Sequence, residues 1–219
     1  MRRVRFGVLT LLCLFGAACG REDTGAVREE RLLRAARNGD LKTVGSLLDL
    51  GVDIETRNPG DGWTPLFWAA VRDNAPCVRL LLSRGALIEA HDHKGLTPLM
   101  HAARWGKKEG VAALFDGGAR IEAVDNNGWN ALLWAAFKGQ AEMAGFLLDH
   151  GAVLEGRDPD GRSPLMLAAM KGHEKTVKLL LARGAKTGVR GPEGKTAADM
   201  AEKNDYGDVA RLIRASSGR

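Results

Sequence analysis

Cysteine, aromatic residues and long apolar runs are all scarce in this chain of 219 residues. Of the three cysteines, only Cys77 lies in the part expected to fold, which excludes a disulfide framework there. Aromatic residues make up 5% of the chain, and this favours a core packed through small side chains. The apolar run from Phe6 to Phe15 is too short to span a bilayer as a helix.

A large excess of one charge is also missing. The chain has 32 basic and 27 acidic residues, for a net charge of +5. Arg2, Arg3 and Arg5 lie in an N-terminal stretch without acid, and the remainder holds 29 basic against 27 acidic groups. Such a balance is not typical of nucleic-acid-binding proteins, so we expect no nucleic acid as a partner.

Residues 1–18 have the pattern of a secretory signal peptide. Three arginines precede the apolar run, and the small residues Gly16, Ala17 and Ala18 follow it, just before Cys19. The end of this segment resembles the bacterial lipoprotein signal, in which the cysteine is lipidated, although Gly16 stands where that signal prefers leucine. Simple cleavage after Ala18 and an uncleaved anchor are the alternatives.

The resemblance to a lipoprotein signal implies export to the periplasmic side of a bacterial envelope. A lipidated Cys19 would be the only attachment to the membrane, and residues 19–27, which are polar and charged, would form a tether. Without lipidation, we expect a periplasmic or secreted protein.

The rest of the chain repeats with a period of 33 residues. Stepping by this interval gives residues that can cap a helix: Thr64, Thr97, Asn130, Ser163 and Thr196. Alanine pairs recur in phase, as Ala69-Ala70, Ala102-Ala103, Ala135-Ala136 and Ala168-Ala169, and earlier, after a step of 34, as Ala35-Ala36.

Each unit has the pattern of two short helices. In residues 94–126, Thr97 and Pro98 open the first helix, since proline costs no hydrogen bond at the first helical position. Gly106 ends it, and a second helix with apolar residues at helical spacing ends at Gly117-Gly118. Such a pair cannot bury its own apolar side, whereas stacking on similar pairs can.

At these residues the chain resembles the ankyrin repeat family, whose signature is Thr-Pro-Leu-His-x-Ala-Ala followed by Val-x-x-Leu-Leu-x-x-Gly-Ala. The resemblance rests on Thr64-Pro65-Leu66, Thr97-Pro98-Leu99, Ser163-Pro164-Leu165, the leucine pairs at 47-48, 81-82, 147-148 and 180-181, and Gly51, Gly85, Gly118, Gly151 and Gly184. The family histidine is replaced by Phe67, Met100, Leu133 and Met166.

The resemblance implies an all-α solenoid of about six helix-turn-helix units with finger turns. The ankyrin repeat domain would cover residues 28–216, with units near 28–60, 61–93, 94–126, 127–159, 160–192 and 193–216. The family's role implies a non-catalytic module that binds another protein on its concave face. A dedicated protective or inhibitory partner of one periplasmic enzyme is the alternative.

No motif predicts enzymatic chemistry or a cofactor. Gly194-Lys195-Thr196 lacks the first glycine of a phosphate-binding loop, because Val189 stands there. Asp158 to Gly161 lacks the last glutamate of a calcium loop. A metal-dependent activity would require His91, His93 and His101 to gather. We expect Cys77 to be a packing residue.

The resemblance also implies a docking face, formed by the residue before each capping position and the two residues after each alanine pair. The predicted partner-binding residues are Trp63, Val71, Arg72, Leu96, Arg104, Trp105, Trp129, Phe137, Lys138, Met170 and Lys171, together with Arg162 in the fifth unit. Aromatic residues with arginine are typical of interface hot spots, and the basic residues favour an acidic partner.

A packing role is the other interpretation of the same residues. Trp63 and Trp129 could cover the junction between finger and helix, while Phe137 and Met170 could pack between units. Trp68 and Trp134 occupy a position usually filled by a core leucine, so we expect packing there.

Overall fold

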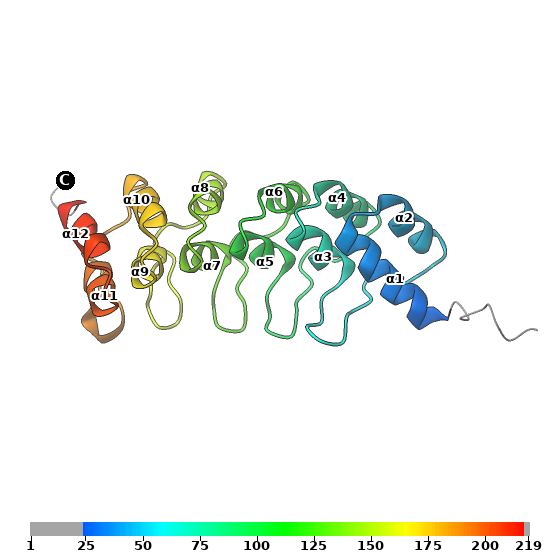
Figure 1. The fold of residues 1–219 in the computed structure, drawn as a ribbon, viewed down its shortest axis with the longest axis horizontal. Coiled ribbons are helices and arrows are strands. Elements are labelled where there is room, and N and C mark those ends of the chain that lie inside the picture. The colour runs from blue at the N-terminus through cyan, green and yellow to red at the C-terminus, as the bar shows by residue number, and fades with distance from the viewer. Residues whose placement is uncertain (1–23, 217–219) are drawn as a thin grey trace, which may run out of the picture.

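The computed structural model describes residues 24–216, which form a single curved array of paired antiparallel helices. One row holds α2, α4, α6, α8 and α10, and α1, α3, α5, α7 and α9 lie beneath it, with the finger loops projecting beyond (Figure 1). The helices are α1 (Gly25–Asn38), α2 (Leu41–Asp49), α3 (Pro65–Val71), α4 (Ala75–Ser83), α5 (Pro98–Arg104), α6 (Lys108–Asp116), α7 (Ala131–Phe137), α8 (Ala141–Asp149), α9 (Pro164–Met170), α10 (Glu174–Ala182), α11 (Ala197–Lys203) and α12 (Gly207–Ser216), with a 3₁₀ turn η1 (Pro192–Gly194).

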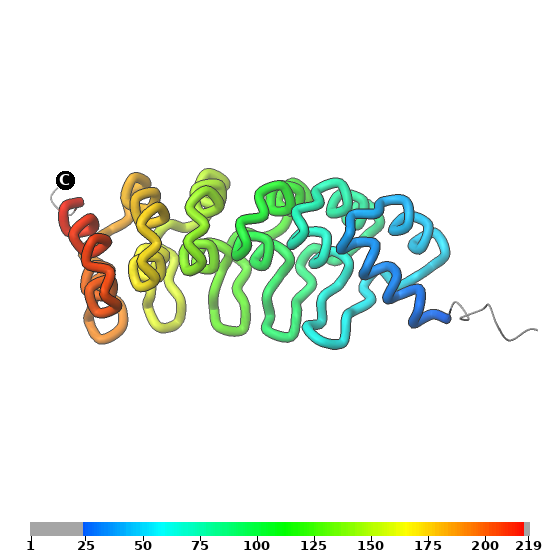
Figure 2. Tube along the Cα trace, in the orientation of Figure 1, coloured from blue at the N-terminus to red at the C-terminus, as the bar shows by residue number. Residues whose placement is uncertain are grey.

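This architecture confirms the predicted all-α solenoid of helix-turn-helix units with finger turns. The path of the chain repeats from the N-terminal helix to the C-terminal helix, so each unit contacts mainly its two neighbours (Figure 2). We call α1, α3, α5, α7, α9 and α11 the inner helices and α2, α4, α6, α8, α10 and α12 the outer helices. The inner helices α3, α5, α7, α9 and α11 are seven residues long, too short to be stable without their neighbours.

The predicted capping residues begin the inner helices, with one exception. The side-chain oxygens of Thr97, Asn130, Ser163 and Thr196 each accept a hydrogen bond from the backbone amide three residues on. Thr64 precedes α3 in the same way but makes no such bond, and its Oγ1 is buried without a partner. The prediction of a side-chain cap is therefore wrong at Thr64, where Pro65 and packing define the start of the helix.

The core runs along the array between the two rows of helices. The alanine pairs are buried, with exposed fractions of 0% for Ala69, Ala70, Ala102 and Ala103, which allows neighbouring helices to approach closely. Cys77 is also fully buried, and burial raises the pKa of its thiol to about 11. Its predicted role as a packing residue is confirmed, because a thiol with so high a pKa is not a nucleophile at neutral pH.

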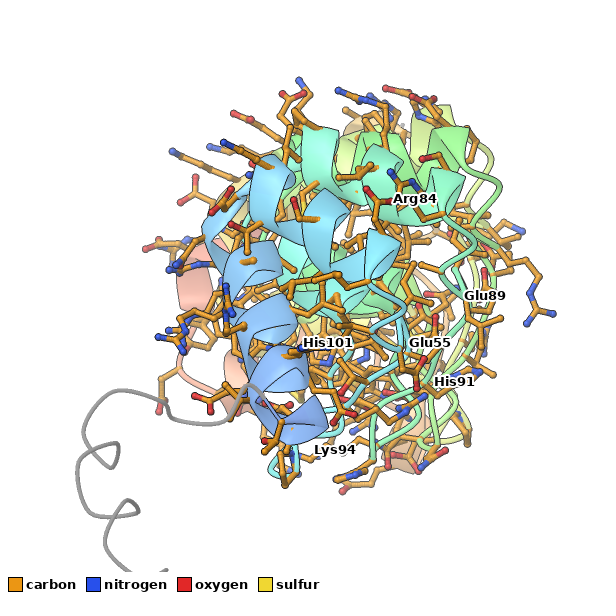
Figure 3. The ribbon with its side chains drawn as sticks, turned by 90° about the vertical axis from the view of Figure 1, so that its right-hand side faces the viewer. Glu55, Arg84, Glu89, His91, Lys94 and His101 are labelled. Carbon is orange, nitrogen blue, oxygen red and sulfur yellow. The ribbon has the colours of Figure 1, made fainter. Side chains whose placement is uncertain are left out.

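Four glutamates tie successive units together. The carboxylate of each accepts a hydrogen bond from a backbone amide in the next unit, at 2.7 to 2.9 Å. The four bonds run from Leu87 to Glu55, from Arg120 to Glu89, from Val153 to Glu122 and from Lys186 to Glu155. In an end-on view Glu55 and Glu89 lie on the same side of the array, on the loops that lead to the fingers (Figure 3).

The outer helix α6 is capped by a residue from the preceding unit. Asp40 and Asn74 cap α2 and α4 with their own side chains, whereas Lys107 precedes α6 and has no acceptor. Asp73 accepts the hydrogen bond from the amide of Gly110 instead, at 2.8 Å. Asp73 adopts φ 61, a conformation that glycine holds at the equivalent Gly106.

This junction is also closely packed, because α6 approaches α3 at Gly110. A Cβ built on Gly110 would lie 2.5 Å from the carbonyl oxygen of Ala70, so only glycine fits there. Cys77, Met143 and Thr176 occupy the equivalent positions of the neighbouring outer helices. The second and third units are therefore joined differently from the others.

The start of the array differs from the sequence prediction. The helix α1 begins at Gly25, inside the stretch 19–27 that was predicted to be a tether. The predicted signal peptide 1–18 and the predicted lipidation site Cys19 lie outside the described residues. Within residues 24–216, no helix combines the length and the apolar character that crossing a bilayer requires.

Candidate functional site

We call the surface formed by the inner helices and the turns at their ends, which carries the predicted partner-binding residues, the inner-helix face. The finger aspartates Asp92, Asp125 and Asp158 hold the turns that lead into it. One oxygen of each carboxylate accepts backbone amides of its own finger turn, for instance those of Asn127 and Trp129 at Asp125. The other oxygen accepts a hydrogen bond from a side chain that differs from unit to unit. The three partners are His101 for Asp92, Trp134 for Asp125 and Arg162 for Asp158.

A first aromatic cluster lies on α3, on α5 and at the finger turn before α3, and consists of Trp63, Phe67, Trp68 and His101. The ring of Trp63 is 4.8 Å from Trp68 and 4.7 Å from His101, measured between centroids. The guanidinium of Arg37, on α1, lies 4.9 Å from the ring of Trp68. The Nε1 of Trp63 is buried and makes no hydrogen bond, so this cluster contains one unpaired donor.

His101 is the titratable member of the first cluster. It is 6% exposed, and its Nε2 lies 2.8 Å from Oδ2 of Asp92. Burial lowers the pKa of His101 below its usual value, and the carboxylate of Asp92 opposes this only in part. Burial alone would raise the pKa of Asp92, but hydrogen bonds from His101 and from backbone amides lower it. Both lowered pKa values agree with a neutral imidazole of His101 that donates a hydrogen bond to the charged carboxylate of Asp92.

A second aromatic cluster lies two units further on and consists of Trp129, Trp134 and Phe137. Trp129 is 4.7 Å from Trp134 and 5.2 Å from Phe137, measured between ring centroids. The Nε1 of Trp134 donates to Oδ2 of Asp125 at 3.0 Å, so its indole is held in place. Beside this cluster, the fingers of the fourth and fifth units enclose a depression of about 450 Å³ lined by Trp129, Trp134 and Arg162.

Cations surround the second cluster. The guanidinium of Arg104 lies 4.6 Å from the ring of Trp134 and 5.5 Å from that of Trp105, and Arg162 lies 5.7 Å from Trp129. These separations are within the range of cation–π interactions. Arg162 also pairs with Asp158 and Asp160.

Four cations on this face, Arg104 among them, lack a carboxylate partner. Among the described residues, none lies within ion-pairing distance of Arg72, Arg104, Lys138 or Lys171. In addition, Nε of Arg104 is buried without a hydrogen-bond partner. The face is therefore positively charged and apolar at once, a combination that favours contact with acidic groups.

Most of the predicted partner-binding residues are accessible. Trp105 is 49% exposed, Arg72 and Lys171 are exposed, and the other accessible members are half-buried: Trp63, Val71, Arg104, Phe137, Lys138 and Met170. Leu96 and Trp129 are the exceptions, with exposed fractions of 1% and 9%. The expectation of an exposed side chain is wrong for these two, because Leu96 belongs to the core and Trp134 and Phe137 pack against Trp129.

Trp68 and Trp134 pack against the core, as expected, but both remain half-buried rather than fully enclosed. Sequence reasoning missed that His101 and Trp134 anchor the fingers. A signal exists in the spacing, since each lies nine residues after its finger aspartate. It becomes informative only once the fold of the finger is known.

The histidines considered for a metal site are engaged separately. His101 contacts Asp92, whereas Nδ1 of His91 lies 3.0 Å from the carbonyl oxygen of Gly95 in its own finger. Among residues 24–216, no three His, Cys, Asp or Glu side chains are arranged to hold a metal ion. The metal-dependent alternative thus receives no support from the positions of these side chains.

Comparison with protein families decides what kind of array this is. The family described as ankyrin repeats (3 copies) matches residues 32–125, 88–158, 117–191 and 153–218. This chain belongs to the ankyrin repeat family. Ankyrin repeats form protein–protein interaction modules that are generally non-catalytic, and they bind other proteins.

Curated ankyrin repeat proteins resemble part of the chain. Ankyrin repeat domain-containing protein 40 from mouse is 41% identical over 68 residues, and the human protein is equally similar. The mouse alignment covers 31% of this chain and 19% of the relative. Ankyrin repeat, SAM and basic leucine zipper domain-containing protein 1 from human is 44% identical over 59 residues, which are 27% of this chain and 12% of that protein.

Proposed function

We propose that this ankyrin repeat protein is exported to a bacterial envelope and binds another protein through the inner-helix face. The observation that supports this most is the set of cations without carboxylate partners beside an exposed aromatic residue. Trp105 is 49% exposed and lies within cation–π distance of Arg104 and Lys138. Large exposed aromatic residues with arginine are typical hot spots of protein interfaces.

The position of the charges favours an acidic partner. A cation at the C-terminal end of a helix is stabilised by the helix dipole, which explains part of the pattern at Arg72, Lys138 and Lys171. Arg104 likewise ends a seven-residue helix, and its guanidinium is in addition held beside the rings of Trp105 and Trp134. A partner carboxylate would gain from cations that are already positioned and have no ion pair to break.

Export and lipid anchoring are proposed from the N-terminal sequence alone. The arginines, the apolar run and the small residues before Cys19 support cleavage by the export machinery and attachment of lipid at that cysteine. The first helix follows closely, since α1 begins at Gly25. A lipid on Cys19 would therefore hold the array close to a membrane surface.

A crosslinked pull-down from intact envelopes tests this function. The full-length chain is compared with a variant carrying Trp105→Ala and Lys138→Ala, both of which remove accessible side chains. The matched control carries Leu87→Ala and Arg79→Ala, which remove an exposed apolar residue and an exposed cation from α4 and the loop after it. The mass of the N-terminal peptide is recorded from the same samples.

We expect one protein to be lost from the Trp105/Lys138 variant and retained by the control. Capture of a single periplasmic enzyme in this way would select the narrower function, a protective or inhibitory partner. An identical set of captured proteins for both variants would show that the inner-helix face is not the binding surface. An unmodified Cys19 would refute the lipid anchor without affecting the binding function.

A further inference from the structure

Three cations and two aromatic rings form a continuous row across three successive units. We call the row Arg104, Trp105, Lys138, Phe137 and Lys171 the cation–aromatic strip. The distances along it, from cation to ring centroid, are 5.5, 5.9, 5.5 and 4.9 Å. Each ring is therefore close to two cations, and the distance between successive cations is at most the sum of the two distances to the ring that they share.

The spacing of the cations is set by the stacking of the helices. Arg104, Lys138 and Lys171 lie at the C-terminal ends of α5, α7 and α9, one in each unit. Packed helices lie about 8–10 Å apart, so one positive charge recurs at about this interval. A ligand that pairs with all three needs carboxylates on one edge with the same repeat.

A polyproline II segment has this repeat. It contains three residues per turn with a rise of about 3.1 Å, so every third side chain lies on the same edge, about 9 Å apart. A β-strand presents side chains on one face every second residue, at about 6.6–6.8 Å, which does not match the cations. Grooves lined by aromatic residues are, moreover, the usual docking sites for proline-rich segments.

We propose that the strip binds a proline-rich acidic segment of the partner protein, in the polyproline II conformation, with a carboxylate at every third residue. The carboxylates pair with Arg104, Lys138 and Lys171, and the residues between them rest on the rings of Trp105 and Phe137. The proposal rests on the proposed function and specifies the chemistry of the partner at that face.

Charge complementarity indicates which ligand occupies the cation–aromatic strip. Among the described residues, the three cations have no carboxylate partner, and the rings between them are accessible, with Trp105 49% exposed and Phe137 half-buried. An α-helix with carboxylates seven residues apart would present charges about 10.5 Å apart. Its diameter of about 10–12 Å would, however, hold most of its surface away from a row of single rings.

Two peptides of identical composition test the register. In Glu-Pro-Pro-Glu-Pro-Pro-Glu the carboxylates recur at every third residue, and in Glu-Pro-Glu-Pro-Glu-Pro-Pro at every second. Both carry a fluorophore, and binding to the full-length chain in detergent is followed by fluorescence anisotropy. We expect the first peptide to bind about tenfold more tightly, since the second can place only one carboxylate opposite a cation and each exposed pair contributes a few-fold.

A charge reversal assigns the binding to the strip. Lys138→Glu should abolish the preference for the first peptide, and a peptide with lysine at its central glutamate position should restore binding to this variant. The control is Lys175→Glu on the outer helix α10, which changes the net charge equally at an exposed residue and should leave both affinities unchanged.

Equal affinities for the two peptides, or equal effects of Lys138→Glu and Lys175→Glu, would overturn the proposal. Tighter binding of a helical peptide with glutamate at every seventh residue would also overturn it. The same holds if Lys138→Glu abolishes binding to anionic vesicles but not to the peptides, or if it dissociates a dimer of the chain. If neither peptide binds while the pull-down still loses a protein from the Trp105/Lys138 variant, the proposed function stands and the polyproline II partner is refuted.

Discussion

The two aromatic clusters share two repeat positions, since Trp63 and Trp68 are the equivalents, two units earlier, of Trp129 and Trp134, yet the clusters are constructed differently. In the first, the finger aspartate Asp92 holds the ionisable His101, and the indole nitrogen of Trp63 is buried without a partner. In the second, Asp125 holds the indole nitrogen of Trp134 directly. Cations without carboxylate partners gather beside the second cluster, at Arg104 and Lys138.

The difference shows how one scaffold position can serve two purposes. The same carboxylate geometry supports a buried polar pair in one unit and an ordered aromatic surface in another. The junctions after the two clusters differ as well. The first relies on Asp73 and Gly110, whereas after the second His173 contacts the carbonyl oxygen of Phe137 at 3.0 Å.

The largest effect is expected at the junction after the first cluster. Gly110→Ala places a methyl group 2.5 Å from a backbone oxygen, which forces α3 and α6 apart and should lower the free energy of unfolding by about 1–3 kcal/mol. The measurement is urea denaturation followed by far-UV circular dichroism.

Gly45→Ala is the matched control for this substitution. Gly45 also lies inside an outer helix, α2, but a Cβ there meets nothing within 4 Å. Alanine should therefore stabilise the chain by about 0.5–1 kcal/mol. If Gly110→Ala raised the free energy of unfolding as the control does, the close approach of α6 to α3 would not be as described.

A smaller effect should separate the two indole nitrogens. Trp134→Phe leaves an oxygen of Asp125 without its side-chain donor, which should cost about 1 kcal/mol more than Trp63→Phe. Trp63→Phe loses comparable packing but removes a donor that is already unpaired. Denaturation midpoints should thus fall further for Trp134→Phe, and the reverse order would contradict the assigned hydrogen bonding.

The smallest effect is a dependence of stability on pH that belongs to the first cluster. Burial lowers the pKa of His101 in the folded chain, so the unfolded chain binds a proton first as the pH falls through about 6.5. Stability should therefore decrease from pH about 7 to about 5, and Asp92, whose pKa is also lowered, adds a loss at more acidic pH.

His101→Gln checks this assignment, because glutamine can donate to Asp92 without titrating. Denaturation midpoints of the variant should change less between pH about 7 and about 5 than those of the parent chain. Besides Asp92, the charges of Arg104 and Asp61 act on His101, so both are kept unchanged in this comparison. An equal pH dependence in both proteins would show that His101 is not the source of the effect.

The repeat and most helix starts could be predicted because they depend on local chemistry. Pro65, Pro98 and Pro164 begin α3, α5 and α9, and the step of 33 residues places each capping position. The burial of Leu96 and Trp129 could not be predicted from local chemistry. Both share a repeat position with the accessible Trp63, and burial depends on which rings pack nearby.

The cation–aromatic strip was predicted as a set of residues but not as a row. The sequence places Arg104 and Trp105 in one unit and Phe137 and Lys138 in the next. Their order in space depends on rotamers and on the stacking of α5, α7 and α9, which no local pattern specifies. The cap that Asp73 supplies to α6 was not predicted for a similar reason, since donor and acceptor belong to different units.

The glutamate bonds between fingers give the array a mechanical property. Glu55, Glu89, Glu122 and Glu155 each bind only the adjacent unit. The junctions therefore deform independently, as elastic elements connected in series do. Small rotations at successive junctions add up, so the displacement between the two ends of the array is much larger than that between two neighbouring units. We therefore expect the array to adapt to a binding partner of different curvature while every helix keeps its own hydrogen bonds.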